Sequence, residues 1–362
     1  MHPDSKTHSK LLNPTIDSLL SSLHQNNDSD SLYIIPEFFK ESNLNSTSNL
    51  QISKKHAFNF LLNEDYKISS SQPYILQIAE AIAEAIDKII SLSNLYLNHD
   101  KLSYEAGKVL AEILYTNPTL NYLDLSSKRL CNGAGQGIAM VLCNNNTLTN
   151  LHLEENYLGD EAGIALAEAL SENITLVKLN LKNNLLSNKA GTELAEALSK
   201  NATLTNLCLG GNNLGELAMK ELIEALYNNM TLTNLDLSNS RLNGSAIKAL
   251  VEALSKNTTL TNLDLSNNKL DKSAKQTLAK TLCKNTTLTN LNLKNNNLAE
   301  TAGKALAEVL CKNTTLTNLD LSDNNLGESV GKALAETICK NTTLTNLDLS
   351  HNKLGETAGK LG

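Results

Sequence analysis

The chain has 362 residues, a net charge of −7 and 19% charged residues. This length exceeds what one hydrophobic core usually supports, so two domains or an array of repeats are expected. The net negative charge gives no basic surface that could bind nucleic-acid phosphates. We find neither a secretory signal peptide nor an apolar segment long enough to span a membrane in the sequence. We therefore expect no nucleic acid and no membrane among the partners, and a cytoplasmic location.

Residues 1–72 show no repeat and are rich in Ser, Asn and Asp. Short helical patterns near residues 14–24 and 54–63 leave a partly helical domain and a disordered segment as alternatives. Residues 73–91 match the helix of a repeat that lacks its strand, with isoleucine at Ile78, Ile82, Ile86 and Ile89. We expect this helix to cap the first strand of the array, which would otherwise be a bare edge.

Leucine recurs every 28 residues from Leu95 to Leu347, and three further leucine series begin at Leu92, Leu97 and Leu102. Each repeat, counted from Leu92, reads L-x-x-L-x-L-x-x-N-x-L. The alternation in L-x-L indicates a short strand with one buried face.

The second half of each repeat has apolar residues at helical spacing, as at Leu306, Val309 and Leu310. Strands stack about 4.8 Å apart whereas packed helices need about 8–10 Å, so a stack of such units must curve with its strands inside. The prediction is an α/β horseshoe solenoid of ten repeats over residues 92–362. Parallel strands line its concave face, helices cover its convex face, and the last repeat is truncated.

Asparagine follows most strands, where a buried amide can bond unpaired backbone groups of the turn. Asp100, Lys128 and Ser240 replace it in the first, second and sixth repeats, so we expect these turns to be held less firmly. A second asparagine, such as Asn313, follows each helix, where we expect a left-handed C-cap. This asparagine also begins most Asn-x-Thr sequons, which we attribute to the repeat consensus and not to glycosylation.

Four of the six cysteines share one repeat position: Cys143, Cys283, Cys311 and Cys339. Helix spacing is too wide for disulfides between them, so we expect reduced thiols with a structural role. A 28-residue spacing also does not suit a metal site, and the sequence has no phosphate-binding loop or catalytic constellation. We expect no metal, no cofactor, no catalytic residue and no small-molecule substrate.

The residues that flank the inward leucines point to the open face of the sheet. An aspartate column there fits either an acidic stripe for a basic partner or the repeat consensus: Asp124, Asp236, Asp264, Asp320 and Asp348. Late repeats are nearly constant on this face, whereas the early ones vary, either by drift or because a protein partner binds there. We predict partner-binding residues on repeats one to four, where aromatic and charged side chains gather. They are Tyr96, Tyr122, Asp124, His152, Glu154, Lys178 and Lys182.

The 28-residue unit and its Gly-x-x-Leu-Ala-x-x-Leu/Ile helix, as from Gly331 to Ile338, resemble the ribonuclease-inhibitor-like subfamily of leucine-rich repeats over about residues 76–362. This resemblance implies a non-enzymatic protein-interaction module that binds a partner on the concave face or its rims. It also implies a catalytic alternative similar to Ran GTPase-activating protein, with Arg129 and Arg241 as candidate residues.

Two further hypotheses concern the biological role. An effector or scaffold of an intracellular bacterium, exported into a host cell, is one form of the binding module. A self-assembling structural protein is the other alternative, because we find no cap at the C-terminal end of the array.

Overall fold

A computed structural model of the chain describes residues 50–51, 94–96, 119–242, 244–270, 278–279 and 281–355. Its strands form one parallel sheet in chain order. They are β1 (Leu50–Gln51), β2 (Asn94–Tyr96), β3 (Tyr122–Asp124), β4 (Asn150–His152), β5 (Lys178–Asn180), β6 (Asn206–Cys208), β7 (Asn234–Asp236), β8 (Asn262–Asp264), β9 (Asn290–Asn292), β10 (Asn318–Asp320) and β11 (Asn346–Asp348). The predicted capping helix of residues 73–91 lies outside the described residues.

Each strand pairs with the next at a shift of one whole repeat, so that Leu123 lies opposite Leu151 and Leu151 opposite Leu179. Equivalent residues of successive repeats therefore form straight columns across the sheet. A repeat that has a different residue at one position therefore places a different side chain within a column of otherwise identical residues.

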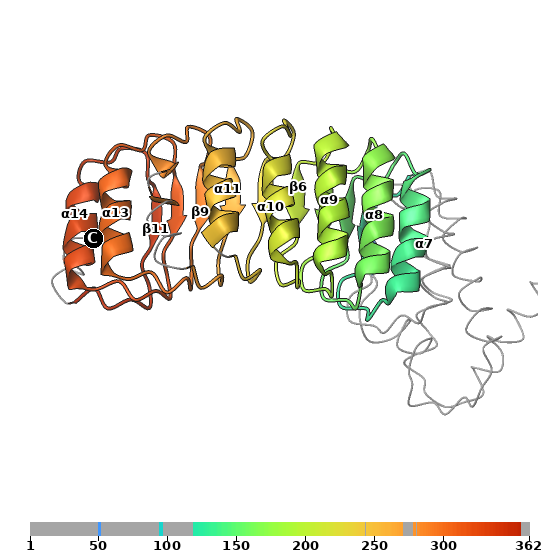
Figure 1. The fold of residues 1–362 in the computed structure, drawn as a ribbon, viewed down its shortest axis with the longest axis horizontal. Helices are drawn as coiled ribbons and strands as arrows, with labels where there is room; N and C mark the ends of the chain where they lie inside the picture. Colours follow the sequence, from blue (N-terminus) through green and yellow to red (C-terminus); the bar gives the residue numbers. More distant parts are fainter. Residues whose placement is uncertain are drawn as a thin grey trace, which may run out of the picture.

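Helices cover one face of this sheet and lie side by side in chain order, with the strands behind them (Figure 1). They are α7 (Asn132–Leu142), α8 (Asp160–Glu172), α9 (Asn188–Lys200), α10 (Glu216–Ala225), α11 (Gly244–Leu254), α13 (Glu300–Leu310) and α14 (Glu328–Ile338). The predicted helical pattern is confirmed, since α13 buries Leu306, Val309 and Leu310. Strand and helix alternate in every complete described repeat, and the predicted α/β repeat solenoid is confirmed.

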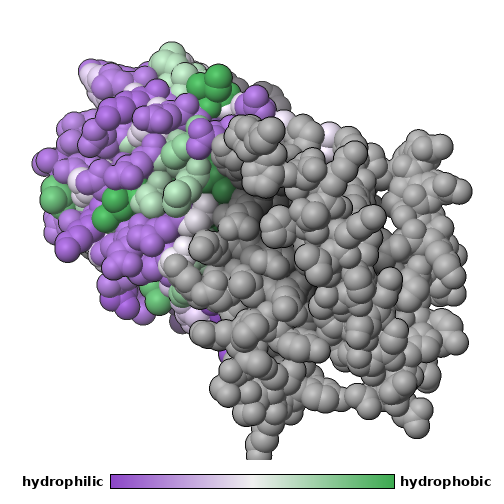
Figure 2. Space-filling view, turned by 90° about the vertical axis from the view of Figure 1, so that its right-hand side faces the viewer, coloured by the Kyte–Doolittle hydropathy of each residue, from purple (hydrophilic) through white to green (hydrophobic). Residues whose placement is uncertain are grey.

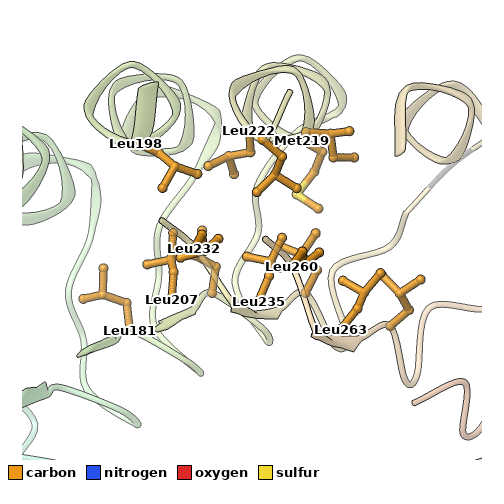
Figure 3. Close-up of a cluster of buried hydrophobic side chains, with 14 of the residues drawn as sticks. Leu181, Leu198, Leu207, Met219, Leu222, Leu232, Leu235, Leu260 and Leu263 are labelled. Atoms are coloured by element: carbon orange, nitrogen blue, oxygen red, sulfur yellow. The ribbon is translucent and has the colours of Figure 1, made fainter. Parts of the chain in front are cut away.

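Leucines from both layers fill the space between sheet and helices. Figure 3 shows Leu207, Leu235 and Leu263 of the strands pointing toward Leu198 and Leu222 of the helices, and all five are almost fully buried. Each buried leucine contributes about 1.5–3 kcal/mol relative to an exposed one. This leucine layer holds the strands in register and thereby places the side chains on the other face of the sheet.

The asparagine that follows each strand ties its repeat to the preceding one. Asn184 donates from Nδ2 to the carbonyl oxygens of Leu153 (2.9 Å) and Leu181 (3.0 Å), and its Oδ1 accepts the N–H of Leu158 (3.1 Å). The same bond to a leucine carbonyl 31 residues earlier recurs at Asn156, Asn212, Asn268, Asn296, Asn324 and Asn352. The predicted structural role of this column is confirmed.

Two described repeats lack this asparagine. The Ser240 hydroxyl donates to the carbonyl oxygen of Ser238 within its own repeat (3.1 Å), so it makes no link to the fifth repeat. This agrees with the weaker sixth turn that the sequence predicts. Lys128 is fully buried, and its backbone N–H donates to Oδ1 of Asn156 (2.9 Å).

The prediction of left-handed caps after the helices is wrong. Asn173 and Asn201 follow α8 and α9 with φ of −71° and −72°, in the extended region. The reason is a bond across repeats: Nδ2 of Asn173 donates to the carbonyl oxygen of Leu142 (2.8 Å), while its Oδ1 accepts the N–H of Leu176 (2.7 Å). The buried amide of this sequon is thus used in the fold.

The two ends of the sheet differ from its middle. Leu50 of β1 lies opposite Leu95 of β2, although the sequence analysis places no strand before β2. A two-residue strand pairs through its backbone groups alone. It therefore has no side-chain pattern from which the sequence could predict it. At the other end, Leu347 and Leu349 pack on the core but are only partly buried, unlike their equivalents in earlier repeats.

Candidate functional site

We call the side of the sheet that faces away from the helices the strand face. The predicted partner-binding residues occupy adjacent strands or the residues just after them, so the structure brings them together. Tyr96 ends β2, where its backbone pairs with Asp124 of β3, and its side chain lies outside the described part. The other predicted residues belong to β3, β4 and β5 and the two residues after each strand: Tyr122, Asp124, His152, Glu154, Lys178 and Lys182.

Tyr122 and His152 form an aromatic pair across neighbouring strands. Their ring centroids lie 5.2 Å apart and their planes are tilted by 31°. Both residues are half-buried. Such rigid, partly exposed rings are favoured anchors at protein interfaces.

Lys182 is held by an ion pair that crosses a whole repeat. Its Nζ lies 2.9 Å from Oδ2 of Asp236, which belongs to the repeat after next. Burial lowers the pKa of Lys182, but the hydrogen bond and charge of Asp236 outweigh this and raise the pKa above its ordinary value. Lys182 is therefore a fixed cation on the strand face.

Gly210 of the intervening repeat makes room for this ion pair. A Cβ at this position would lie 2.8 Å from Oδ1 of Asp236, too close for a side chain to fit without moving the carboxylate. Burial, together with the charge of Asp236, raises the pKa of the nearby Cys208 thiol to about 11. This thiol stays protonated at neutral pH and is a poor nucleophile. The sequence analysis missed the ion pair, although glycine in a column of polar residues was a signal for it.

The aspartate column has a structural role. Oδ1 of Asp124 accepts the N–H of Ser126 (2.9 Å), and Oδ1 of Asp320 accepts that of Ser322 (2.8 Å). Asn180 makes the same bond to the N–H of Lys182 (3.0 Å), so an uncharged oxygen acceptor can make this bond as well as a carboxylate. This supports the repeat consensus as the origin of the column.

Asparagines on the late strands bond to one another. Asn262 donates to Oδ1 of Asn234 (2.7 Å), and Asn318 donates to Oδ1 of Asn290 (2.6 Å). These amides satisfy part of their hydrogen-bonding capacity within the sheet. The late strand face therefore presents asparagines that are already bonded to one another.

Exposed large apolar side chains gather in the same part of the chain as the varied strand face. Figure 2 views the end of the solenoid that carries α7 and shows a mostly hydrophilic described surface with separate hydrophobic side chains. Within the described residues, seven of the eight fall between residues 140 and 230: Met140, Tyr157, Ile174, Leu185, Leu217, Tyr227 and Met230.

Tyr157 and Leu185 are the most informative of these residues. They hold the same position in adjacent repeats and are 54% and 60% exposed. The equivalent residues Arg129, Asn213 and Arg241 are polar. The sequence analysis missed this pair, and a comparison of that column between repeats would have found it.

The structure does not bring Arg129 and Arg241 together. Both are exposed in post-strand loops, four repeats apart, which is roughly 19 Å at the spacing of parallel strands. In the described part of the chain, no group of His, Cys, Asp and Glu is arranged to hold a metal ion. No helix among the described residues is long and apolar enough to cross a membrane.

All six cysteines have free thiols. The four that share one repeat position are exposed, and the structural role predicted for them is limited to contacts such as that of Cys311 Sγ with Thr337 Oγ1 (3.5 Å): Cys143, Cys283, Cys311 and Cys339. Their position at the end of each helix places them at the surface.

A family model described as leucine-rich repeat matches the chain at residues 144–167, 256–274, 284–307, 312–335 and 340–360. The first of these segments contains β4 and the beginning of α8, and the others have the same place in their repeats. No curated protein matches the chain.

Several solved structures are similar in part. An internalin from Listeria monocytogenes is 19% identical with a TM-score of 0.45, over 75% of this chain and 71% of the internalin. The leucine-rich repeat domain of APL1 is 21% identical with a TM-score of 0.41, over 73% of this chain and 64% of that domain. The actin-binding site 2 of leiomodin-1 is 24% identical with a TM-score of 0.34, over 42% of this chain and 90% of the chain in that structure. None of these structures belongs by its name to the ribonuclease-inhibitor-like subfamily, so membership of that subfamily stays a prediction.

Proposed function

Because the chain is a leucine-rich repeat protein, we propose that it is a non-enzymatic module that binds a partner protein on the strand face of repeats one to four. Repeat solenoids expose an extended surface of this kind and generally use it for binding. The observation that carries the proposal is the aromatic pair of Tyr122 and His152, with charged side chains on the same and the next strand.

The other half of the array offers less to a partner. Its strand face repeats asparagine, aspartate and serine, and several of these groups bond within the sheet. Interface energy is concentrated in a few aromatic and charged anchors surrounded by neutral contacts. Tyr96, Tyr122, His152 and Lys178 are the anchors in this proposal, while Asp124, Glu154 and Lys182 surround them.

Affinity capture with paired variants tests this proposal. The bait is the full chain in three forms: unchanged, Tyr96→Ala with Tyr122→Ala, and Asp320→Ala with Asp348→Ala. Lysates of the producing organism and of a eukaryotic cell are used in parallel, and proteins that the unchanged bait retains are quantified by mass spectrometry. Thermal unfolding of each bait checks that the fold is kept.

The tyrosine variant should bind a specific partner more weakly by upwards of about 2 kcal/mol, or roughly 30-fold, because such anchors dominate binding energy. The aspartate variant should retain it. Loss of the partner from the aspartate variant alone would place the site on the late repeats and contradict the proposal. A partner from the eukaryotic lysate would support an effector role, and one from the producing organism a scaffold.

A further inference from the structure

Four side chains of β3, β4 and the loop after β4 form a compact patch on the strand face, which we call the ring–carboxylate patch: Tyr122, Asp124, His152 and Glu154. Asp124 lies directly opposite His152 in the paired strands. Tyr122 precedes Asp124 by two residues and Glu154 follows His152 by two, so all four are on the same face. The strand spacing of about 4.8 Å keeps them within reach of one group on a partner.

The patch joins two ring faces to two carboxylates. The Tyr122 and His152 rings lie 5.2 Å apart. Asp124 uses Oδ1 for the Ser126 N–H, and Glu154 uses Oε2 for Nδ2 of Asn180 (2.9 Å). The second oxygen of each carboxylate makes no hydrogen bond within the described structure. Aromatic faces beside carboxylate oxygens attract a cation by charge and by the ring quadrupole.

Among the described residues, no lysine or arginine forms an ion pair with these carboxylates. The charge of Glu154 acts on Lys182, but the ammonium of Lys182 is bonded to Asp236, two repeats further along the chain. Glu154 receives a neutral amide from Asn180 instead, and in the described structure neither Asp124 nor Glu154 forms an ion pair. The patch therefore has two carboxylates without an ion-pair partner among the described residues, next to two rings.

We propose that the ring–carboxylate patch binds the guanidinium group of an arginine side chain of the partner protein, a step that rests on the proposed function. Guanidinium is planar, stacks on aromatic rings and donates two parallel N–H bonds to carboxylates. An ammonium is a compact and strongly hydrated point charge that gains less from a ring face. The patch therefore selects arginine over lysine.

An NMR titration tests the site without the partner. The full-length, isotope-labelled protein is titrated with acetyl-arginine amide, with the matched lysine compound and with the uncharged citrulline compound. Arginine should shift the resonances of Tyr122 and His152 in a saturable way. Lysine should bind several-fold more weakly, and citrulline should give no saturable shift.

Matched variants assign the effect to the carboxylates. Asp124→Asn keeps the turn, because Asn180 makes the same turn bond in the fourth repeat. Asp124→Asn or Glu154→Gln should weaken arginine binding on the order of fivefold or more, since charge-assisted hydrogen bonds are about twice as strong as neutral ones. Asp320→Asn, in the same column but without a ring pair, should leave arginine binding unchanged.

Equal binding of citrulline or lysine would overturn the proposal, as would equal weakening by Asp320→Asn or the absence of shifts at Tyr122 and His152. These results are distinct from failure of the proposed function. A partner that still requires Tyr122 while arginine does not bind contradicts the guanidinium site alone. Arginine binding at the patch with a partner that depends on Asp320 and Asp348 contradicts the strand-face proposal alone.

Discussion

Single polar side chains hold successive repeats together at both ends of each strand. Asn184 and its equivalents follow the strands and donate to a leucine carbonyl of the preceding repeat. Asn173 and its equivalents precede the strands and make the same kind of bond. Each amide satisfies buried backbone groups that would otherwise cost about 1–3 kcal/mol. The stability of the array therefore depends on small side chains at fixed positions as well as on leucine.

The missing asparagine at Ser240 yields a prediction about stability. Ser240→Asn should raise the free energy of unfolding by about 1 kcal/mol, because the amide would restore the bond to the preceding repeat. Chemical denaturation monitored by circular dichroism measures the change. Asn212→Ser, the reverse change one repeat earlier, should lower the free energy by a similar or larger amount. A neutral result for both variants would show that the column does not stabilise the turns.

Asp160 couples α8 to the start of α9. Its Oδ1 accepts the N–H groups of Ser187 (2.8 Å) and Ala190 (3.3 Å), and Oδ2 accepts the Ser187 hydroxyl. Burial raises the pKa of Asp160, but the hydrogen bonds from Ser187 outweigh this effect and lower the pKa below its ordinary value of 3.8. The carboxylate thus stabilises the fold above pH 3.8, and this contribution is lost as the pH falls through the lowered pKa.

Asp160→Ala should cost about 1 kcal/mol of stability at pH 7, in the range of other lost helix caps. The difference from the unchanged protein should shrink as the pH falls below the lowered pKa, where Asp160 is protonated. Urea unfolding at several pH values measures this. Asp160→Asn is the matched control, because Asn188 holds the same position one repeat later and accepts the N–H of Ala218. A pH-independent loss for Asp160→Ala would contradict a charge-dependent role.

At the scale of elements, neighbouring helices approach each other through small residues. A Cβ at Gly163 in α8 would lie 2.5 Å from Cβ of Ala190 in α9 and 2.8 Å from Cδ2 of Leu186. Both distances are too short for atoms in contact. The glycine therefore sets how closely α8 and α9 pack, and the small alanine at the helix start serves the same contact.

Two effects of opposite sign compete in Gly163→Ala. Helix propensity alone would favour alanine by about 1 kcal/mol. Overpacking in a filled core costs about 1–3 kcal/mol, and we expect it to dominate because the clash involves rigid neighbours. Thermal or urea unfolding should show net destabilisation, and adding Ala190→Gly should recover part of it. A stabilised single variant would mean that α8 and α9 separate easily.

At the scale of the whole molecule, stability should fall toward the C-terminal end. Leu347 and Leu349 are partly buried, whereas Leu207 and Leu209 in the middle of the array are fully buried. Each repeat of a solenoid is stabilised by its neighbours, so a repeat whose leucines are only partly buried opens at lower free energy.

Hydrogen exchange measured by mass spectrometry tests this gradient. Amides of residues 320–355 should exchange faster than those of residues 180–270, with intermediate values between them. Light scattering at the same concentrations shows whether chains associate, since stacking of a second chain on β11 would protect the end. Equal protection of both regions in a monomer would contradict the prediction.

The sequence alone was sufficient for the solenoid, the asparagine links of the turns and the composition of the strand face. Each of these depends on a local pattern that the chain repeats many times, so that the 28-residue period also determines the register of the sheet. Tertiary structure decided which strand-face groups meet. The sequence placed Tyr122, His152 and Lys182 on one face, but the ring pair and the ion pair depend on rotamers and on how far side chains reach.

Lys182 reaches Asp236 across the fifth repeat, where Gly210 has no side chain beside the carboxylate. Asn173 stays extended because its amide bonds a neighbouring repeat. Contacts of this kind join residues from different repeats. They depend on how the repeats pack, and the pattern within one repeat gives no information about that.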